Sequence, residues 1–450
     1  MANYMIQKEK IKDNLLSLYS KENDFLLNKR LKTTLSNIIT EKEIPNIKDE
    51  EWKKTSLNGI FKHKFEKGKK INVPNEFVNT FSFNDSDADR LVFVNGIFIA
   101  EKSKITQKLN NIYVGSLKDG LKTHKEIIKE NYCKTDIHKQ NFFTAINSMY
   151  SENGFFVYVP DNTILENPVH IVNFVHGDNK KVFSQTRNLI VAGKNSIIQL
   201  ISSYHSLSED FTLNNVATEF IAGENSSIKY YIFEGEGNLA SIINNVSVNQ
   251  QKGSSFKTNT SMLCGNLVRN EIHVKHEGEH CTTDLQGIYL PDKEQHFDNF
   301  LNINHGKPNC KSNQLYKGII DNKAKAVFLG KVYVAKDAQK TDAAQSNKVL
   351  LLTDNAKSFS RPQLEIYADD VSCAHGSTTG QLDKEALFYM KTRGIPEAKA
   401  KTLLMTAFIG DVLDKIEISS YKDYVKYLVN KRLKGQKVEG LCTLKICPSC

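Results

Sequence analysis

The feature of the sequence that most constrains the fold is a stretch of about 225 residues, from Phe155 to Gly380, without helical periodicity. It consists of short runs rich in Val, Ile, Tyr and Phe, which Gly, Asn, Ser and Lys residues separate. Two runs resemble each other at an offset of 30 positions: IVAGKNSIIQLI (190–201) and FIAGENSSIKYY (220–231). Degenerate repeats of this length predict a solenoid whose coils bury their apolar faces on one another, and a parallel β-helix fits best. The alternative is a β-sandwich, which has strands every 8–12 residues or so and no repeated text.

Helical patterns flank this β-rich stretch. On its N-terminal side, apolar residues between 27 and 38 recur at the spacing of one helix face. LVFVNGIFIA (91–100) predicts a β-hairpin, and a short helix follows around 117–150. On the C-terminal side, Asp383 is placed to cap the first of three predicted helices. The predicted domains are an N-terminal helical region (1–88), a β-helix core (89–379, with the hairpin and short helix at 91–150), a C-terminal helical domain (380–434) and a mobile cysteine-containing tail (435–450).

Composition and motifs exclude several classes of protein. The net charge is +9, but the Lys residues are scattered among acidic residues, so we expect no nucleic-acid partner. No apolar run reaches the roughly 18 residues of a membrane-spanning helix, so we expect no membrane partner. The N-terminus lacks the pattern of a secretory or transit peptide, which predicts a cytoplasmic protein with mostly reduced thiols. A P-loop motif is absent, so the chain should not hydrolyse nucleotides itself.

The most specific candidate site is the pair Cys373 and His375. Alternate residues of a strand share a face, and the parity that includes Leu364 changes at Asp369-Asp370, where we infer a corner or bulge. Beyond that corner the thiol and the imidazole point the same way, roughly 6.6 Å apart along the strand. They supply at most two ligands, and a tetrahedral iron or zinc site needs about four. The others would come from an adjacent coil, another chain, sulfide or water. Alternatively, Cys373 is a buried apolar residue and His375 a hydrogen-bonded strand end.

Two other segments contain metal-ligand residue types. EIHVKHEGEHC (271–281) offers His273, His276, His280 and Cys281. Although His276 and His280 have the separation of a helical zinc pair, the surroundings are β-type, so we favour polar residues on an exposed sheet face.

The tail CTLKICPSC (442–450) offers Cys442, Cys447 and Cys450. These thiols could bind zinc or another soft metal, or take part in thiol exchange, and the sequence assigns them no role.

The C-terminal block carries a specific resemblance. PQLEIYADDV (362–371), His375-Gly376 and LFYMKTRGI (387–395), followed by an Ala-rich helix, are similar to the SufD family of iron–sulfur cluster assembly proteins. Supporting similarity comes from DAAQSNKVLLL (342–352), FVNGIF (93–98) and EWKKTSL (51–57). The resemblance covers nearly the whole chain, to about residue 430. The sister SufB family has a different C-terminal pattern, so a SufB-like cluster scaffold is the alternative.

The resemblance implies a right-handed parallel β-helix core flanked by N-terminal and C-terminal helical regions. It implies a scaffold subunit, not an enzyme, which pairs with SufB through the β-helices and binds the ATPase SufC through its C-terminal helices. In isolation the chain could form a homodimer. The family position matching His375 is implicated in iron acquisition or nascent-cluster assembly at the SufB interface, and Cys373 matches a family cysteine. The residues expected to face the ATPase are Phe388, Arg393, Leu404, Phe408 and Val412.

Some related complexes hold reduced flavin, but no flavin motif is present in this sequence. A rival function is that of a carbohydrate-active β-helix protein with Asp369-Asp370 as an acid pair. Adjacent strand residues point to opposite faces, which poorly suits two carboxylates that must flank one glycosidic bond.

Overall fold

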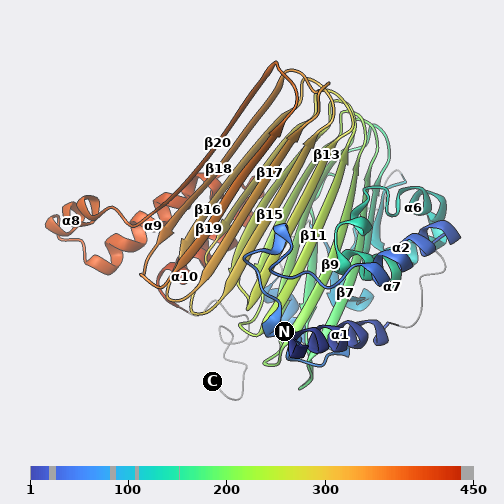
Figure 1. The fold of residues 1–450 in the computed structure, drawn as a ribbon, viewed down its shortest axis with the longest axis horizontal. Coiled ribbons are helices and arrows are strands. Elements are labelled where there is room, and N and C mark those ends of the chain that lie inside the picture. Colours follow the sequence, from blue (N-terminus) through green and yellow to red (C-terminus); the bar gives the residue numbers. More distant parts are fainter. Residues whose placement is uncertain (1, 20–26, 82–87, 107–110, 152, 437–450) are drawn as a thin grey trace.

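The computed structural model describes residues 2–19, 27–81, 88–106, 111–151 and 153–436. Within these residues, two sheets of ten strands each face one another and form a parallel β-helix, which confirms the predicted fold class (Figure 1). Sheet A consists of β1 (Glu66–Lys67), β4 (Tyr113–Ser116), β5 (Phe155–Val159), β7 (Val182–Ala192), β9 (Thr212–Ala222), β11 (Ala240–Gln250), β13 (Leu267–His276), β15 (His296–His305), β17 (Lys325–Val334) and β19 (Lys357–Ile366). Sheet B consists of β2 (Asp89–Val94), β3 (Ile97–Phe98), β6 (Val169–Val175), β8 (Ile197–Ser206), β10 (Ser227–Gly235), β12 (Ser255–Cys264), β14 (Thr282–Tyr289), β16 (Lys311–Ile320), β18 (Thr341–Leu351) and β20 (Val371–Gly380).

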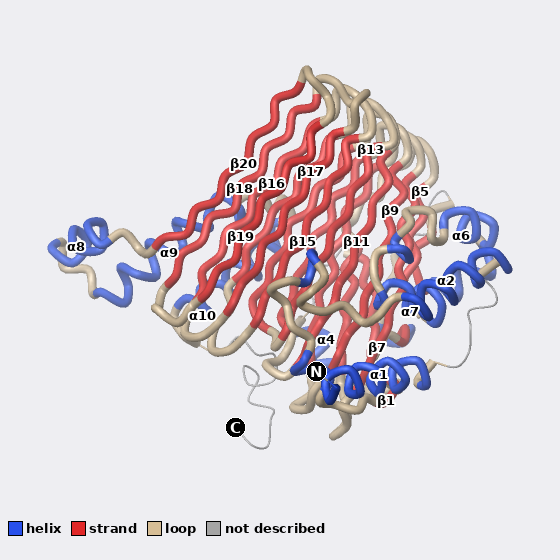
Figure 2. The backbone as a smooth tube through the Cα atoms, viewed as in Figure 1, coloured by secondary structure: helices blue, strands red, loops and turns tan. Residues whose placement is uncertain are grey.

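Helices lie at both ends of the chain (Figure 2). The N-terminal helices are α1 (Ala2–Ser17), α2 (Lys29–Glu41), α3 (Asn58–Phe61), α4 (Asn75–Thr80), α5 (Leu117–Thr123), α6 (Lys125–Asn131) and α7 (Phe142–Tyr150), with the 3-10 turns η1 (Glu50–Trp52), η2 (Ala100–Lys102) and η3 (Ile137–Lys139). The C-terminal helices are α8 (Lys384–Thr392), α9 (Glu397–Leu413) and α10 (Ser419–Leu433). The predicted hairpin is present as β2 and β3, with Asn95 and Gly96 at φ 51° and 79° in its tight turn.

From β7 onward each coil contributes one strand to sheet A and the next strand to sheet B. The repeated text in the sequence reflects this arrangement, because Ile190 of β7 pairs with Phe220 of β9 at the offset of 30 positions. The described corners from sheet A to sheet B include seven with a residue in the left-handed conformation: Asn162, Asn195, Asn225, Gly253, His280, Asn309 and Lys340. The left-handed conformation favours Asn and Gly, so these residue types recur at the corners even where the strand sequences show no similarity.

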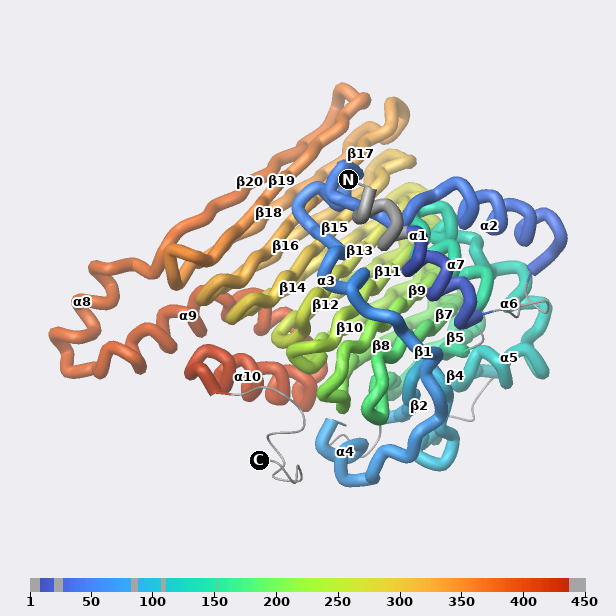
Figure 3. Tube along the Cα trace, turned by 60° about the horizontal axis from the view of Figure 1, so that its bottom comes forward, coloured from blue at the N-terminus to red at the C-terminus, as the bar shows by residue number. Residues whose placement is uncertain are grey.

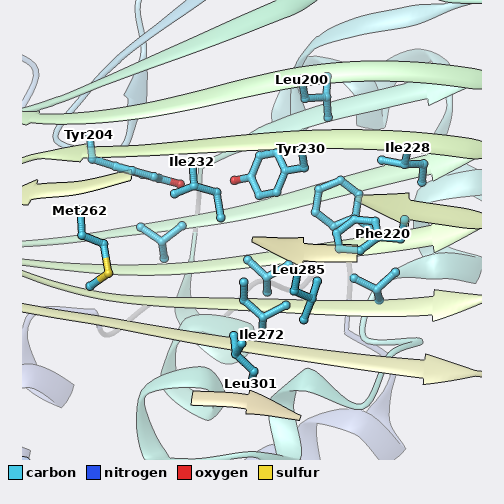
Figure 4. Close-up of a cluster of buried hydrophobic side chains, with 14 of the residues drawn as sticks. Leu200, Tyr204, Phe220, Ile228, Tyr230, Ile232, Met262, Ile272, Leu285 and Leu301 are labelled. Atoms are coloured by element: carbon cyan, nitrogen blue, oxygen red, sulfur yellow. The ribbon is translucent and has the colours of Figure 1, made fainter. Parts of the chain in front are cut away.

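The interior between the two sheets is filled mainly by large apolar side chains (Figure 4). Phe220 from sheet A and Tyr230 from sheet B meet there with ring centroids 4.9 Å apart, and both are fully buried. The outer faces of the sheets are apolar where helices cover them. Helix α7 packs on the outer face of sheet A with α2 against it, and α9 and α10 pack on the outer face of sheet B (Figure 3). Both faces of the central strands are therefore buried.

Candidate functional site

The candidate site lies at the end of the solenoid formed by the last coil. Within the described residues, β19 and β20 are the terminal strands of their sheets, and each pairs on one side only, with β17 and β18. Figure 1 shows β20 at the outer edge of the stack, with α8 pointing away from it. Side chains of β20 that would be interior in any earlier coil are exposed or half-buried here, because no further coil of the described chain covers them.

Cys373 and His375 continue two rows of interior side chains. In β18, the odd-numbered residues from Thr341 to Val349 are buried and point into the solenoid. The register pairs Ala343 with Cys373 and Gln345 with His375, so both candidate residues occupy inward-facing positions. The chain turns from β19 into β20 at residues 367–370, which confirms the predicted corner at Asp369-Asp370. The thiol and the imidazole therefore share one face of an edge strand, as expected.

The two side chains differ in environment. His375 is exposed, and its ring makes no hydrogen bond within the part of the chain that the structure describes. Cys373 is half-buried beside Leu364 and other apolar residues of the last two coils. Burial, followed by the negative charge of Asp342, raises the pKa of the Cys373 thiol, although a backbone hydrogen bond at Ala343 opposes them. His375 is the more accessible ligand of the two, and Cys373 is held as a neutral thiol.

The last coil does not form a complete metal site by itself. No group of three or more His, Cys, Asp or Glu side chains with metal-binding geometry occurs among the described residues. His375 and Cys373 supply at most two ligands, whereas a tetrahedral iron or zinc site needs about four. Any metal ion held at this end would therefore need further ligands from outside the described chain.

The segment 271–281, for which we favoured polar residues on an exposed sheet face over a zinc site, runs from β13 into the corner before β14, so its four candidate metal ligands do not lie on one element. His276 is fully buried inside the solenoid, where its Nε2 lies 2.8 Å from the Thr283 hydroxyl; our placement of this residue on an exposed sheet face was wrong. His280 is the left-handed corner residue, and it is exposed. The Cys281 thiol donates to the Gly278 carbonyl at 3.2 Å. In the preceding coils Ser196, Ser226 and Ser254 make the same contact with the carbonyl three residues earlier, so Cys281 is a structural corner residue.

The C-terminal helices carry the residues predicted to face an ATPase. Phe388 of α8 is 69% exposed, and Arg393 at the end of α8 stacks on the Tyr389 ring and donates to its hydroxyl at 3.1 Å. Leu404 and Phe408 are half-buried. Val412 is fully buried among the apolar residues that join α9 to sheet B, so the structure places it in an intramolecular contact.

A groove of about 1040 Å³ lies beside these helices. Its apolar lining comes from the last coils, α8, α9 and α10, including Leu351, Leu382, Leu387, Leu403 and Met405. Lys384, Lys399, Lys401 and Glu397 form its charged rim. Leu403, on α9, is 44% exposed. Helix α8 protrudes near the open end of the solenoid (Figure 3). Together with the groove it forms an accessible surface of mixed apolar and charged character.

Sequence reasoning missed two polar arrangements. The first joins Trp52 to Arg269, whose guanidinium lies 3.7 Å from the indole centroid, with both side chains buried. The second is a pair of buried amides: Gln345 Nε2 donates to Gln314 Oε1 at 2.7 Å directly below His375 in the stack. Only the spacing of 31 positions between the two glutamines, which is one coil, could have indicated the second arrangement.

The tail thiols Cys442, Cys447 and Cys450 lie outside the described residues. No helix in the described part of the chain combines the length and the apolar character needed to cross a membrane.

The fold and the open last coil define a class of β-helix proteins, and comparison with known proteins identifies the family. Residues 174–408 match the SufBD core domain of the SUF system for iron–sulfur cluster assembly, and residues 9–171 match the SufBD N-terminal region. The chain therefore belongs to the SufBD family of iron–sulfur cluster assembly proteins.

Named relatives match most of the chain. An iron–sulfur cluster assembly SufBD family protein of Synechocystis is 28% identical over 91% of this chain and 92% of its own length. The iron–sulfur cluster assembly protein SufD of Escherichia coli is 26% identical over 87% of this chain and 90% of its own length. SufD of Bacillus subtilis is 24% identical over 69% of this chain and 71% of its own length. The recognised resemblance to the SufD branch is thus confirmed.

Proposed function

We propose that this chain is a SufD-type scaffold subunit that pairs with a SufB-type subunit through the open end of its solenoid and presents His375 to iron there. The single observation that carries the proposal is the exposure of an interior row of side chains on an unpaired edge strand. Unpaired edges are normally protected against association, and here the edge of each sheet ends with backbone groups that a partner strand could bind.

The number of ligands supports a shared site. His375 offers an exposed imidazole, a ligand type that suits iron, whereas Cys373 is half-buried and the pKa of its thiol is raised. A partner that contributes thiolates to the same interface would complete the coordination of an iron ion or of a nascent cluster. The metal is then cargo that is assembled and passed on, and a site completed only at an interface can open when the interface opens.

The C-terminal helices support a second proposed contact, with a SufC-type ATPase. The exposed apolar residues Phe388, Tyr389 and Leu403 lie on α8 and α9 beside the groove, away from the contacts of α9 with the solenoid. A partner that buried them would remove apolar surface that the chain itself leaves in water.

Helix α9 is attached directly to β16, which lies two strands from β20 in sheet B. Lys317 of β16 donates to the Phe408 carbonyl at 2.6 Å and pairs with Asp411 at 2.8 Å. The same strand carries Gln314, part of the interior row that leads to His375. ATP-driven movement of a SufC-type subunit bound to α8 and α9 would thus act on the coils next to the interface, as a rigid-body switch.

The test of the interface role is anaerobic reconstitution of the complex with SufB-type and SufC-type partners, once with the wild-type chain and once with the His375→Ala variant. We expect the complex to form and its iron content and cluster yield to fall severalfold. The control is His280→Asn, which removes another exposed histidine but keeps a residue that tolerates the left-handed corner. Unchanged iron content in the His375→Ala complex would contradict the proposal.

The test of the ATPase contact is Phe388→Glu, with Tyr427→Glu on α10 as its control, since both side chains are exposed, at 69% and 55%. We expect the first variant to lose the SufC-type partner in co-purification while it keeps the SufB-type partner, and the second to keep both. Equal retention of the ATPase by the two variants would place the contact elsewhere.

A further inference from the structure

The interior row below His375 contains two stacked amides. Gln314 of β16 and Gln345 of β18 are in register, 0% and 4% exposed, and joined by the 2.7 Å hydrogen bond from Gln345 Nε2 to Gln314 Oε1. Opposite them, β17 has Gly330. A Cβ at that position would lie 1.7 Å from Gln345 Nε2 and 3.0 Å from Gln314 Oε1, so the amides occupy space that only a glycine leaves free.

The amides are oriented in one direction along the stack. On the side of the preceding coil, Gln314 neighbours Leu285 of β14, whose side chain has no polar group. Gln314 Nε2 accordingly has no hydrogen-bond partner among the described residues. Gln314 Oε1 faces the following coil and accepts a hydrogen bond from Gln345. Gln345 directs its own Nε2 back toward Gln314, so its Oε1 is left for the last coil, where the residue in register is His375. That Oε1 is inaccessible to solvent and has no partner.

We propose that Gln345 is a positioning residue for His375: its Oε1 accepts a hydrogen bond from one ring N–H and leaves the other ring nitrogen as the ligand. The proposal rests on the proposed role of His375 at the interface. Neighbouring strands are about 4.8 Å apart, so an imidazole that turns toward the interior reaches the amide through a rotamer change. The ring is exposed in the free chain, and exposed side chains change rotamer within picoseconds to nanoseconds.

A neutral amide suits this task. Metal-bound histidines usually donate their second ring N–H to a carbonyl, carboxylate or water, which fixes the tautomer and the orientation of the ring. An amide oxygen accepts that bond without adding charge to the interior of the solenoid, where an ionised carboxylate would be costly. Gln314 holds the Gln345 amide from below, and Gly330 provides the space, so the acceptor is already in place before iron arrives.

The experiment follows the His375 ring directly in the free chain. The protein is labelled with ¹⁵N only at histidine, and His375 is assigned from the signal that His375→Ala removes. At a pH above the ordinary histidine pKa of about 6.5, we expect a protected ring N–H and a tautomer ratio different from that of free histidine in the same buffer. In Gln345→Leu both signatures should disappear. Val349→Ala, at another buried inward position of β18, should leave them unchanged.

The second measurement tests the same bond through iron. In the reconstituted complex, Gln345→Leu should weaken the binding of added Fe(II) by about 10- to 100-fold, and it should have no further effect in the His375→Ala background. Gly330→Ala, which forces the amide to move, should reproduce both effects if Gln345→Leu folds poorly. If iron binding needs His375 but is the same in Gln345→Leu, and the ring signals do not change, the inference is wrong and the proposed function stands. If the ring signals depend on Gln345 but His375→Ala binds iron normally, the hydrogen bond stands and the ligand role is wrong.

Discussion

The buried guanidinium of Arg269 provides a prediction whose size follows from the structure. Arg269 of β13 is fully buried; its Nε lies 2.7 Å from Glu271, it also pairs with Asp298 of β15, and it donates to the Glu51 carbonyl at 3.0 Å. Both carboxylates are at least 97% buried. These contacts fasten η1, with Trp52, to the outer face of sheet A. We therefore predict that Arg269→Met detaches this N-terminal segment and lowers the free energy of unfolding.

The magnitude comes from the buried charges. Removal of one partner of a buried ion pair typically costs about 3–5 kcal/mol, because the remaining charges lose their compensation. For Glu271, burial alone would raise the pKa, but the charge of Arg269 overrides this and lowers the pKa to about 2. Relative to an ordinary value of 4.5, that shift corresponds to about 3 kcal/mol. The two values agree, so we expect a loss of about 3–5 kcal/mol near neutral pH.

The free energy of unfolding of Arg269→Met should depend on pH with the opposite sign to that of the wild type, and in a different pH range. In the wild type the folded-state pKa of Glu271 is depressed, so its contribution is complete above about 4.5 and is lost as the pH falls toward 2. In Arg269→Met, burial without the cation raises the pKa of Glu271 above its ordinary range. The unfolded chain then releases protons that the folded chain keeps, so the variant should become more stable, not less, as the pH is lowered from 8 to 5 or so.

The assay is urea unfolding followed by fluorescence, because Trp52 is the one tryptophan of the chain and lies against Arg269. Circular dichroism of the sheets is measured in parallel. The control is Lys275→Met on the same strand, which removes an exposed pair with Glu277 and should change stability by less than about 1 kcal/mol. The reasoning is refuted if Arg269→Met unfolds with the same midpoint as this control, or if the stability of Arg269→Met does not rise as the pH is lowered from 8 to 5 or so.

Three further predictions test other parts of the structure. Gly330→Ala should lower stability by about 1–3 kcal/mol in thermal denaturation, because its Cβ would overlap the Gln345 amide, whereas Gly376→Ala, with no atom within 4 Å, should be neutral. Burial raises the pKa of Cys373, so iodoacetamide should modify it more slowly than free cysteine at pH 7.5 or so, and faster as the pH rises; equal rates by mass spectrometry would contradict this. Arg432 of α10 donates to the Leu290 carbonyl at 3.0 Å, so Arg432→Ala should speed hydrogen exchange in α10 but not in the sheets; unchanged exchange in α10 would show that this contact does not hold the helix.

Sequence reasoning predicted the local features of this fold because their causes are local. The repeated text at 190–201 reflects strands that pair in register with the next coil, and the change of parity at Asp369-Asp370 reflects a real corner. The cap of α8 also depends on nearby atoms only, since Asp383 accepts from the backbone of Glu385 at 2.9 Å. Each of these features is set by residues within one turn or one coil.

The remaining features could not be predicted, because they depend on which face of an element is covered. Strand β11 is buried at every position, so its sequence does not show which side chains point inward. For the same reason His276 was assigned to an exposed face, although it is interior. The apolar rows of α9 predicted a broad contact surface but not that Val412 contacts its own sheet. Arg269 and Trp52 are more than two hundred positions apart, and no local pattern joins them.

The candidate site exists because the coil repeat ends at β19 and β20. In coil after coil, the inward positions of sheet B are covered by the next pair of strands, and the row that contains Gln314 and Gln345 is buried. One coil later the same row brings His375 to the surface, because β20 is the last strand of its sheet among the residues that the structure describes. At the other end the hairpin of β2 and β3 and the antiparallel strand β4 terminate the two sheets. A chain that closes one end of its solenoid and leaves the interior row open at the other has an asymmetry that folding alone does not require, and association through that end would account for it.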